Sequence, residues 1–127
     1  MSTEAEDDAL QGQQRKFQKE LNAGIVSLIL LSIMADAREP LYGYQIAKQL
    51  EHEGTGTAIM KQGTLYPVLR SLCAAGLLDS KVEPSVAGPP RRYYQITEAG
   101  QNVLAQWKNA WESTRDFVDS ILRGPKS

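Results

Sequence analysis

The sequence has very few of the side chains that cross-link a chain or bind metals. Its 127 residues include one cysteine, Cys73, and one histidine, His52. A single cysteine cannot form a disulfide within the chain, and the two residues together cannot supply the three or four ligands of a zinc site. We therefore expect no internal disulfide, no bound metal and no cofactor.

Catalytic groups are similarly scarce. His52 is the only imidazole that could activate a serine or cysteine nucleophile. The sequence contains no glycine-rich loop that could hold a phosphate, and no pair of acidic residues on an inward face of a predicted helix. We therefore expect a protein that is not an enzyme.

Long hydrophobic runs are also missing. The densest apolar stretch, residues 25–35, is interrupted by Ser27 and Ser32, and it is shorter than the roughly 20 apolar residues of a membrane-spanning helix. The chain begins with four acidic residues within positions 4–8, unlike the basic segment of a targeting signal. We therefore expect a buried core helix over residues 25–35, in a cytoplasmic protein that does not cross a membrane.

The chain carries no large excess of charge of either sign. Its formal net charge is −1, whereas nucleic-acid-binding domains are more often basic. The charge is unevenly distributed, however, because residues 61–92 hold five basic residues and only two acidic ones. A phosphate backbone would meet this local patch and not the average charge of the chain.

What is present is the composition of one ordinary soluble domain, with 42% hydrophobic and 23% charged residues. Residues 1–13 are polar and acidic without periodicity, so we expect a disordered tail there. Residues 14–97 are predicted to form the main folded domain, and residues 98–123 a final helix. Within the main domain, apolar residues spaced by three and four predict helices over residues 15–37, 43–53 and 63–75.

The third of these helices has a polar outer face. Its apolar residues, from Leu65 to Leu72, recur at the spacing of one helical stripe and are predicted to face the core. The opposite face carries Arg70, with Thr64 and Tyr66 beside it. This face is therefore a candidate surface for contact with another molecule.

After the third helix the apolar periodicity changes from that of a helix to that of a strand. Residues 78–82 and 92–96 alternate between polar and apolar, which predicts a β-hairpin whose long tip is formed by residues 83–90. Three helices followed by a hairpin is the order of a winged helix-turn-helix, a mainly α fold with a β-hairpin. In such a fold a helix can enter the major groove of DNA while basic hairpin residues contact phosphates.

The final helix is predicted to begin after Thr97, whose hydroxyl can cap it, and to stop at Gly124. Along it, residues at alternating spacings of three and four form the seam of a helix that pairs with another helix. The residues of this seam are Leu104, Trp107, Trp111, Thr114, Val118 and Ile121.

Four segments of the chain follow one another in a specific order. They are residues 41–46 (LYGYQI), 63–72 (GTLYPVLRSL), 76–78 (GLL) and 88–97 (GPPRRYYQIT). Together they resemble the sequence pattern of the PadR family of transcriptional regulators, and several ordered matches are more specific than one short motif. Two positions depart from the family's pattern, because Cys73 replaces a usual acidic residue and Lys81-Val82 stands where a tryptophan is common.

The resemblance implies a homodimeric repressor of the small PadR branch, in which the last helix packs on the N-terminal helix of the partner. Some members of this branch bind flat aromatic molecules at the dimer interface. Trp107 and Trp111 therefore fit two roles, as part of the dimer core or as a stacking platform for a small aromatic or lipophilic inducer. The residues expected at the dimer interface are Phe17, Leu21, Ile25, Leu28, Leu104, Trp107, Trp111, Val118 and Ile121.

The expected DNA partner is a pseudo-palindromic operator, with the third helices of the two protomers about one helical turn apart. We expect Thr64 and Tyr66 to reach bases, although Tyr66 could instead pack against its own helix and the preceding loop. The phosphate contacts are expected from Lys61, Arg70, Arg91, Arg92 and Tyr44. Arg91 and Arg92 must point to opposite sides of their strand, so at least one of them is alternatively expected to be only a solvated charge.

A second function remains open at this point. The chain could be a winged-helix adaptor that recognises protein without specific DNA binding, and its acidic net charge is the main support for that alternative. A steep dependence of DNA affinity on salt would argue against the adaptor.

Overall fold

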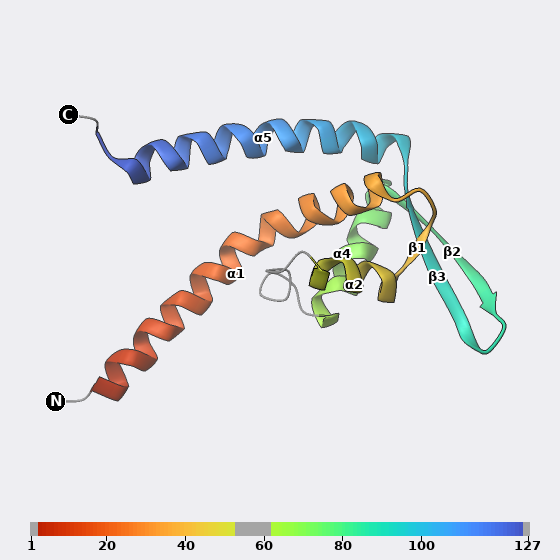
Figure 1. The fold of residues 1–127 in the computed structure, drawn as a ribbon, viewed down its shortest axis with the longest axis horizontal. Coiled ribbons are helices and arrows are strands. Elements are labelled where there is room, and N and C mark those ends of the chain that lie inside the picture. The colour runs from red at the N-terminus through yellow and green to blue at the C-terminus, as the bar shows by residue number, and fades with distance from the viewer. Residues whose placement is uncertain (1–2, 53–61, 126–127) are drawn as a thin grey trace.

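The computed structural model describes residues 3–52 and 62–125. Its elements, shown in Figure 1, are α1 (Thr3–Asp36), β1 (Leu41–Tyr42), α2 (Gly43–His52), α4 (Gln62–Ala74), β2 (Leu78–Ser85), β3 (Gly88–Ile96) and α5 (Glu98–Arg123). The second helix begins at residue 43 as predicted, and its predicted last residue, 53, lies outside the described residues. The third helix is confirmed to within one residue at each end. The fold is the predicted winged helix-turn-helix, mainly helical with a small antiparallel sheet and a long last helix.

Helix α1 begins at Thr3, so the prediction of a disordered tail is wrong for residues 3–13. This segment is rich in Ala, Glu and Gln, which lose little conformational freedom in a helix. Glu4 and Glu6 lie in the first turn, where the partial positive charge of the helix N-terminus stabilises carboxylates. The polar composition that suggested disorder is therefore equally compatible with an exposed helix.

The C-terminal half of α1 lies in the core. Val26, Leu30, Leu31 and Met34 are buried, and this part of the helix packs against α4, α5 and β3. By length and composition alone α1 could also cross a membrane, and 22% of its apolar window is buried in the protomer. The buried residues of the helix all lie in this C-terminal half. The prediction of a core helix over residues 25–35 is confirmed.

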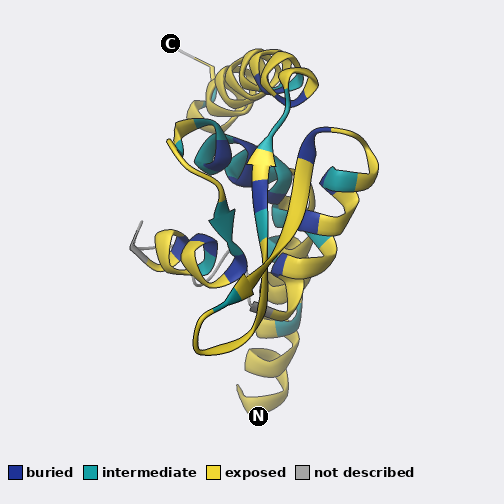
Figure 2. Cartoon of the chain, turned by 90° about the vertical axis from the view of Figure 1, so that its right-hand side faces the viewer, coloured by how far each residue is buried: buried dark blue, intermediate teal, exposed yellow. Residues whose placement is uncertain are grey.

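One apolar cluster ties the other helices to the sheet (Figure 2). Its further buried side chains are Ile46, Leu50, Leu65, Leu69, Leu72, Leu77, Leu78, Tyr94 and Leu104. The predicted leucine stripe of α4 is thus confirmed. Because this stripe fixes the rotation of α4 about its axis, the opposite face of the helix is turned to solvent.

The hairpin formed by β2 and β3 is longer than predicted. Its pairing continues out to Ser85 and Gly88, so most of residues 83–90 is strand and the tip is short. The register is irregular between Glu83 and Ser85, and Pro84 at that point has no N–H to donate to the ladder. The prolines that suggested a long loop are instead accommodated in an exposed, irregular ribbon.

Strand β1 is a two-residue strand that the sequence pattern does not predict. Leu41 pairs with Tyr94, and Tyr42 pairs with Tyr93, in a sheet of order β1-β3-β2. Because side chains alternate across a strand, Leu41 and Tyr94 face the core while Tyr42 and Tyr93 face away from it. β1 thereby joins the start of α2 to the hairpin.

The junction between the hairpin and α5 is held by Thr97. Its Oγ1 accepts a hydrogen bond from the N–H of Gly100 at 3.0 Å and donates one to the carbonyl of Gly76 at 2.7 Å. Its own N–H donates to the carbonyl of Leu77 at 3.1 Å, and a side chain at position 100 would collide with that carbonyl. The predicted cap of α5 is confirmed, as is its end at Gly124.

Candidate nucleic-acid interface

The exposed face of α4 carries the residues that the sequence assigns to base contacts. Thr64, Tyr66 and Arg70 are exposed, whereas Leu65 and Leu69 between them are buried. α4 begins on the same side of the molecule as the tip of the hairpin (Figure 1). A DNA groove placed against the start of α4 would therefore also meet the hairpin.

Tyr66 is held in place by α2. A Cβ atom added to Gly43, the first residue of α2, would lie 2.7 Å from Cε1 and from Oη of Tyr66. The side chain nevertheless remains 39% exposed. Tyr66 thus packs against the neighbouring helix and still presents part of its surface to solvent.

Arg92 lies on the face of β3 that also carries the buried Tyr94, and its Nη1 donates a hydrogen bond to Oγ of Ser80 on β2 at 2.9 Å. Ser80 is also hydrogen-bonded with the thiol of Cys73 near the end of α4. Burial raises the pKa of this thiol, and the hydrogen bond with Ser80 and the charge of Arg92 oppose the shift only in part. A chain of polar groups therefore links α4, β2 and β3.

Arg70 and Arg92 come from two elements that pack together. Both side chains are exposed, and α4 packs directly against β2, the strand paired with β3. Burial raises the pKa of the Tyr94 phenol on β3, the charge on Cys73 raises it further, and the charges of Arg92 and Arg70 act in the opposite direction. One cation of α4 and one cation of the hairpin, both of them predicted phosphate ligands, therefore belong to adjoining elements.

Arg91 points to the other side of β3, as the alternation of a strand predicts. Its guanidinium carbon lies 4.5 Å from the centroid of the Tyr42 ring. Tyr42 in turn stacks with Tyr44, with 6.3 Å between ring centroids and 19° between the ring planes. Tyr44, in the first turn of α2, is 54% exposed.

Lys61 lies outside the described residues. The structure adds a basic residue that the sequence analysis missed, because Nζ of Lys48 lies 5.6 Å from the centroid of the Tyr44 ring. The spacing of four residues between Tyr44 and Lys48 on one helix could have indicated this contact. The contact between Tyr42 and Tyr93 could not be found in the same way, because only the pairing of β1 with β3 makes these two residues neighbours.

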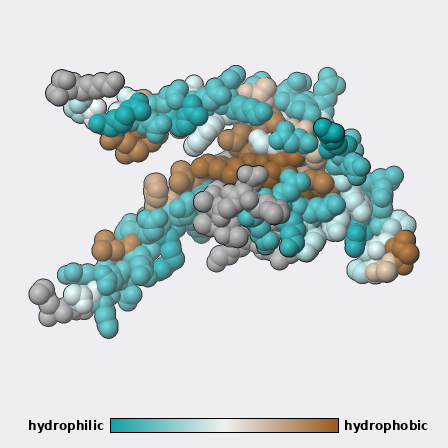
Figure 3. Space-filling view, in the orientation of Figure 1, coloured by the Kyte–Doolittle hydropathy of each residue, from teal (hydrophilic) through white to brown (hydrophobic). Residues whose placement is uncertain are grey.

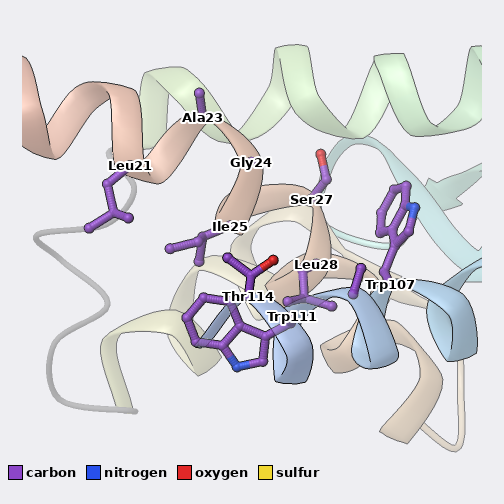
Figure 4. A pocket seen from close by; sticks show the side chains of 10 residues that line it. Leu21, Ala23, Gly24, Ile25, Ser27, Leu28, Trp107, Trp111 and Thr114 are labelled. Atoms are coloured by element: carbon purple, nitrogen blue, oxygen red, sulfur yellow. The ribbon is translucent and has the colours of Figure 1, made fainter. Parts of the chain in front are cut away.

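A separate apolar groove of about 570 Å³ lies between α1 and α5 (Figure 3). The ribbon in Figure 1 shows that the two helices diverge there. Figure 4 shows Leu21, Ile25 and Leu28 of α1 on one side of it, and Trp107 and Trp111 of α5 on the other. Trp107 packs against the core, whereas Trp111 is 39% exposed. The groove is therefore lined by residues that the sequence analysis assigned to a dimer interface.

Exposed apolar side chains continue beyond this groove on both helices. They are Leu10, Phe17 and Leu21 of α1, and Trp111, Phe117, Val118, Ile121 and Leu122 of α5. Leu104 differs from the rest of the predicted seam, because it is 3% exposed and packs in the core of its own protomer. The prediction of a dimer contact at Leu104 is corrected accordingly: the first turns of α5 rest on α1 of the same chain.

The described residues offer little that could hold a metal or a cofactor. Within residues 3–52 and 62–125, no three His, Cys, Asp or Glu side chains are grouped so that they could bind a metal. A polar hollow of about 230 Å³ lies where the end of α1 meets β3 and α5, and Arg38, Glu39, Gln95 and Gln101 are among its lining residues. The absence of a metal and a cofactor stays a prediction.

Comparison with known proteins identifies the family. The transcriptional regulator PadR-like family matches residues 30–106. Transcriptional regulator Rv3488 of Mycobacterium tuberculosis is 32% identical over 106 residues, which cover 84% of this chain and 91% of that protein. A PadR family transcriptional regulator from Eggerthella lenta has a TM-score of 0.75 at 32% identity, covering 95% of this chain and 98% of that one. A transcriptional regulator from Clostridium thermocellum has a TM-score of 0.71 at 26% identity, covering 80% and 97%.

The fold and the face formed by α4 and the hairpin define a winged-helix transcriptional regulator. The chain belongs to the PadR-like family of transcriptional regulators. The resemblance carried by residues 41–46, 63–72, 76–78 and 88–97 is therefore confirmed, and the members of this family are regulators and not enzymes.

Proposed function

We propose that the chain is a cytoplasmic, homodimeric PadR-type repressor that binds a pseudo-palindromic operator and is released by a small aromatic or lipophilic molecule. The observation that carries this proposal is the convergence of α4 and the hairpin. Thr64, Tyr66 and Arg70 are exposed on α4, Arg92 is exposed on β3, and α4 packs against the hairpin. One surface thus combines side chains that can read bases with cations that can hold phosphates.

In this proposal the start of α4 enters the major groove. Thr64 and Tyr66, in the first turns, reach base edges. Arg70 lies about a turn further along and contacts a phosphate, together with Arg91 and Arg92 of the hairpin. Tyr44 and Lys61 complete the phosphate contacts, which position the protein without reading sequence.

The proposed dimer covers the apolar surface of α1 and of the C-terminal part of α5, which makes residues 98–123 the dimerisation helix. Contiguous apolar surface of this kind is seldom left in water by a folded protein. Phe17, Val118 and Ile121 are among its exposed side chains. A second copy that packs its own α5 and α1 against them would remove this surface from water.

The proposed inducer site is the groove beside Trp107 and Trp111. Its volume of about 570 Å³ is within the range of sites for small molecules, and apolar lining with two indoles favours flat aromatic ligands. A ligand that binds better to a dimer with misaligned α4 helices weakens the binding of DNA. Because linkage is reciprocal, DNA weakens the binding of this ligand by the same factor.

One observation supports a second candidate function. The net charge of −1 is unusual for a protein that binds DNA, and it fits a winged-helix adaptor that recognises another protein. The two functions differ in one measurable respect, because only phosphate contacts release condensed counterions and make the affinity for DNA fall steeply with salt.

The experiment that separates them is fluorescence anisotropy of the purified protein on a labelled duplex from its own upstream region. A scrambled duplex of the same length is measured beside it, at several salt concentrations. The repressor predicts tight, salt-sensitive binding that prefers the native duplex. Weak binding to both duplexes with little dependence on salt would favour the adaptor.

Two variants make this test specific for the proposed surface. Thr64→Ala should reduce the preference for the native duplex. Arg70→Ala should weaken binding to both duplexes. It should also reduce the slope of log affinity against log salt by about one for each phosphate that the protein no longer neutralises. Lys108→Ala is the matched control, because it removes one exposed positive charge from α5. If Lys108→Ala and Arg70→Ala change binding equally, α4 is not the DNA-binding face.

A further inference from the structure

Five side chains of β1, α2 and β3 form a continuous row on the surface, which we call the tyrosine–cation strip. Its members, in spatial order, are Arg91, Tyr42, Tyr44 and Lys48, with Tyr93 set edge-on against Tyr42. Arg91 lies 4.5 Å from the centroid of Tyr42, and Lys48 lies 5.6 Å from the centroid of Tyr44. The rings of Tyr42 and Tyr93 are 5.5 Å apart at an angle of 68°. Each cation is therefore seated on an aromatic ring, and the two rings are stacked on each other.

The strip bridges the two parts of the proposed DNA-binding surface. At one end, Arg91 belongs to the hairpin. In the middle, Gly43 stands between Tyr42 and Tyr44 and is in close contact with Tyr66 of α4. The start of α4 and the tip of the hairpin lie on the same side of the molecule in Figure 1, and β1 runs into α2 between them.

The arrangement keeps the guanidinium of Arg91 available for a ligand. Glu83 is directly opposite Arg91 in the register of the hairpin, but its carboxylate is 3.8 Å from Nζ of Lys81. Among residues 3–52 and 62–125, no carboxylate is paired with Arg91. A guanidinium that stacks through its flat face keeps its N–H groups in the plane of the group, where they can donate to two oxygens of one phosphate.

Lys48 is similarly accessible. Its ammonium is 3.9 Å from a carboxylate oxygen of Glu51, and the side chains of both residues are more than half exposed. An exposed pair of this kind contributes little free energy, so it does not prevent Lys48 from exchanging Glu51 for another anion. Lys48 is the one cation of the strip that the sequence analysis did not assign to DNA.

We propose that the tyrosine–cation strip extends the phosphate-binding surface of this regulator. On the strip, Arg91 and Lys48 contact the DNA backbone beside the groove entered by α4, and Tyr42 and Tyr93 are positioning residues for Arg91. The proposal rests on the proposed DNA-binding function and adds Lys48, Tyr42 and Tyr93 to it. The strip binds backbone and carries no sequence preference.

The test measures affinity for a labelled duplex of random sequence, because phosphate contacts do not depend on an operator. Arg91→Ala and Lys48→Ala should each weaken binding on the order of tenfold and reduce the slope of log affinity against log salt by about two in a dimer, one for each protomer. Lys108→Ala on α5 is the control for the loss of one positive charge. If Arg91→Ala and Lys48→Ala behave like Lys108→Ala, the strip is not a phosphate-binding surface.

The role of Tyr42 is tested by a pair of variants. Tyr42→Phe keeps the ring beneath Arg91 and should retain the salt slope of the wild type. Tyr42→Leu removes the ring, so it should lower both affinity and slope toward those of Arg91→Ala, and it should have little further effect when combined with Arg91→Ala. If Tyr42→Leu lowers the melting temperature and weakens binding equally with or without Arg91, Tyr42 is structural and does not position Arg91.

Failure of this proposal can be distinguished from failure of the proposed function. If the wild type shows no salt-dependent binding to either the native or the random duplex, the DNA-binding function itself is wrong. If Arg70→Ala flattens the salt slope and the variants of the strip do not, DNA binding stands and only the strip is wrong.

Discussion

At the scale of single residues, Gly43 is a position where the candidate interface leaves no room for a side chain beside Tyr66. Because a Cβ at position 43 would lie 2.7 Å from two atoms of the Tyr66 side chain, Gly43→Ala must displace that side chain. The displaced atoms are the far end of a partly exposed side chain, so we expect a loss of stability of only about 1 kcal/mol, the lower end for overpacked sites, together with a loss of DNA affinity. Thermal unfolding and anisotropy on the native duplex measure the two effects.

Two comparisons isolate this contact. Gly63→Ala, at the start of α4, adds a methyl group where nothing lies within 4 Å, so it should leave stability unchanged or raise it slightly. In a Tyr66→Ala background, Gly43→Ala should cost much less than in the wild type. An equal cost in both backgrounds would mean that Gly43 is needed for the backbone of α2 and not for Tyr66.

The half-buried thiol of Cys73 gives a pH dependence with a definite sign. Burial raises the pKa of this thiol above its ordinary value. Between the ordinary value and the raised one, the folded protein binds the proton more tightly than the unfolded chain does, so stability falls as the pH rises. Tyr94, whose pKa is also raised by burial, adds to this loss at higher pH.

We expect the melting temperature to fall as the pH rises above the ordinary pKa of a cysteine thiol, and Cys73→Ala to make that fall shallower. Because the charge on Cys73 also raises the pKa of Tyr94, the difference between the two proteins reports the thiol together with its effect on Tyr94. If the melting temperatures of the wild type and of Cys73→Ala fall in parallel as the pH rises, the thiol titrates alike in the folded and unfolded states.

At the scale of secondary structure, the sequence predicts best the elements that carry their own periodicity. The leucines of α4 fix both the helix and the face that it exposes, and Thr97 marks the start of α5 within one residue. β1 has two residues and exists only because Leu41 and Tyr42 pair with β3, so no local pattern indicates it. The tyrosine–cation strip depends on that pairing, which is why its members look unrelated in the sequence.

The N-terminal part of α1 shows the opposite error, because the polar sequence predicts disorder where the structure has a helix. Gly12 lies within this segment, and a side chain there would have nothing within 4 Å. Gly12→Ala should therefore increase helicity in far-UV circular dichroism, and Gly12→Pro should reduce it, because proline costs about 3 kcal/mol in a helix interior. Spectra that are identical for both variants and the wild type would support the disordered tail.

At the scale of the whole molecule, the two surfaces with proposed functions belong to different parts of the chain. α4 and the hairpin present one surface, and α1 with α5 presents the other (Figure 1). The apolar core connects them, because α1 packs on both α4 and α5 and Thr97 ties the end of the hairpin to the start of α5. A change in the angle between α1 and α5 can therefore be transmitted to the position of α4.

The predicted dimer can be tested without disturbing the fold of the protomer. Val118 and Ile121 are exposed side chains of α5, so replacing both with Asp should leave the protomer folded and prevent a second copy from packing there. We expect a monomer in sedimentation or light scattering, with the helical spectrum of the wild type. Leu104→Ala, in the core of the protomer, should instead lower stability by about 2–5 kcal/mol.

The same double variant links the dimer to DNA binding. A dimer contacts two half-sites at once, and tethering makes the second contact intramolecular, so its affinity depends on the spacing of the half-sites. A monomer with an intact α4 should still bind in a salt-dependent way, but its affinity for the native duplex should fall at least roughly a hundredfold and should no longer change when the half-site spacing is altered by half a helical turn. If the Val118→Asp, Ile121→Asp protein stays dimeric, or keeps the spacing dependence of the wild type, the C-terminal part of α5 is not what aligns the two α4 helices.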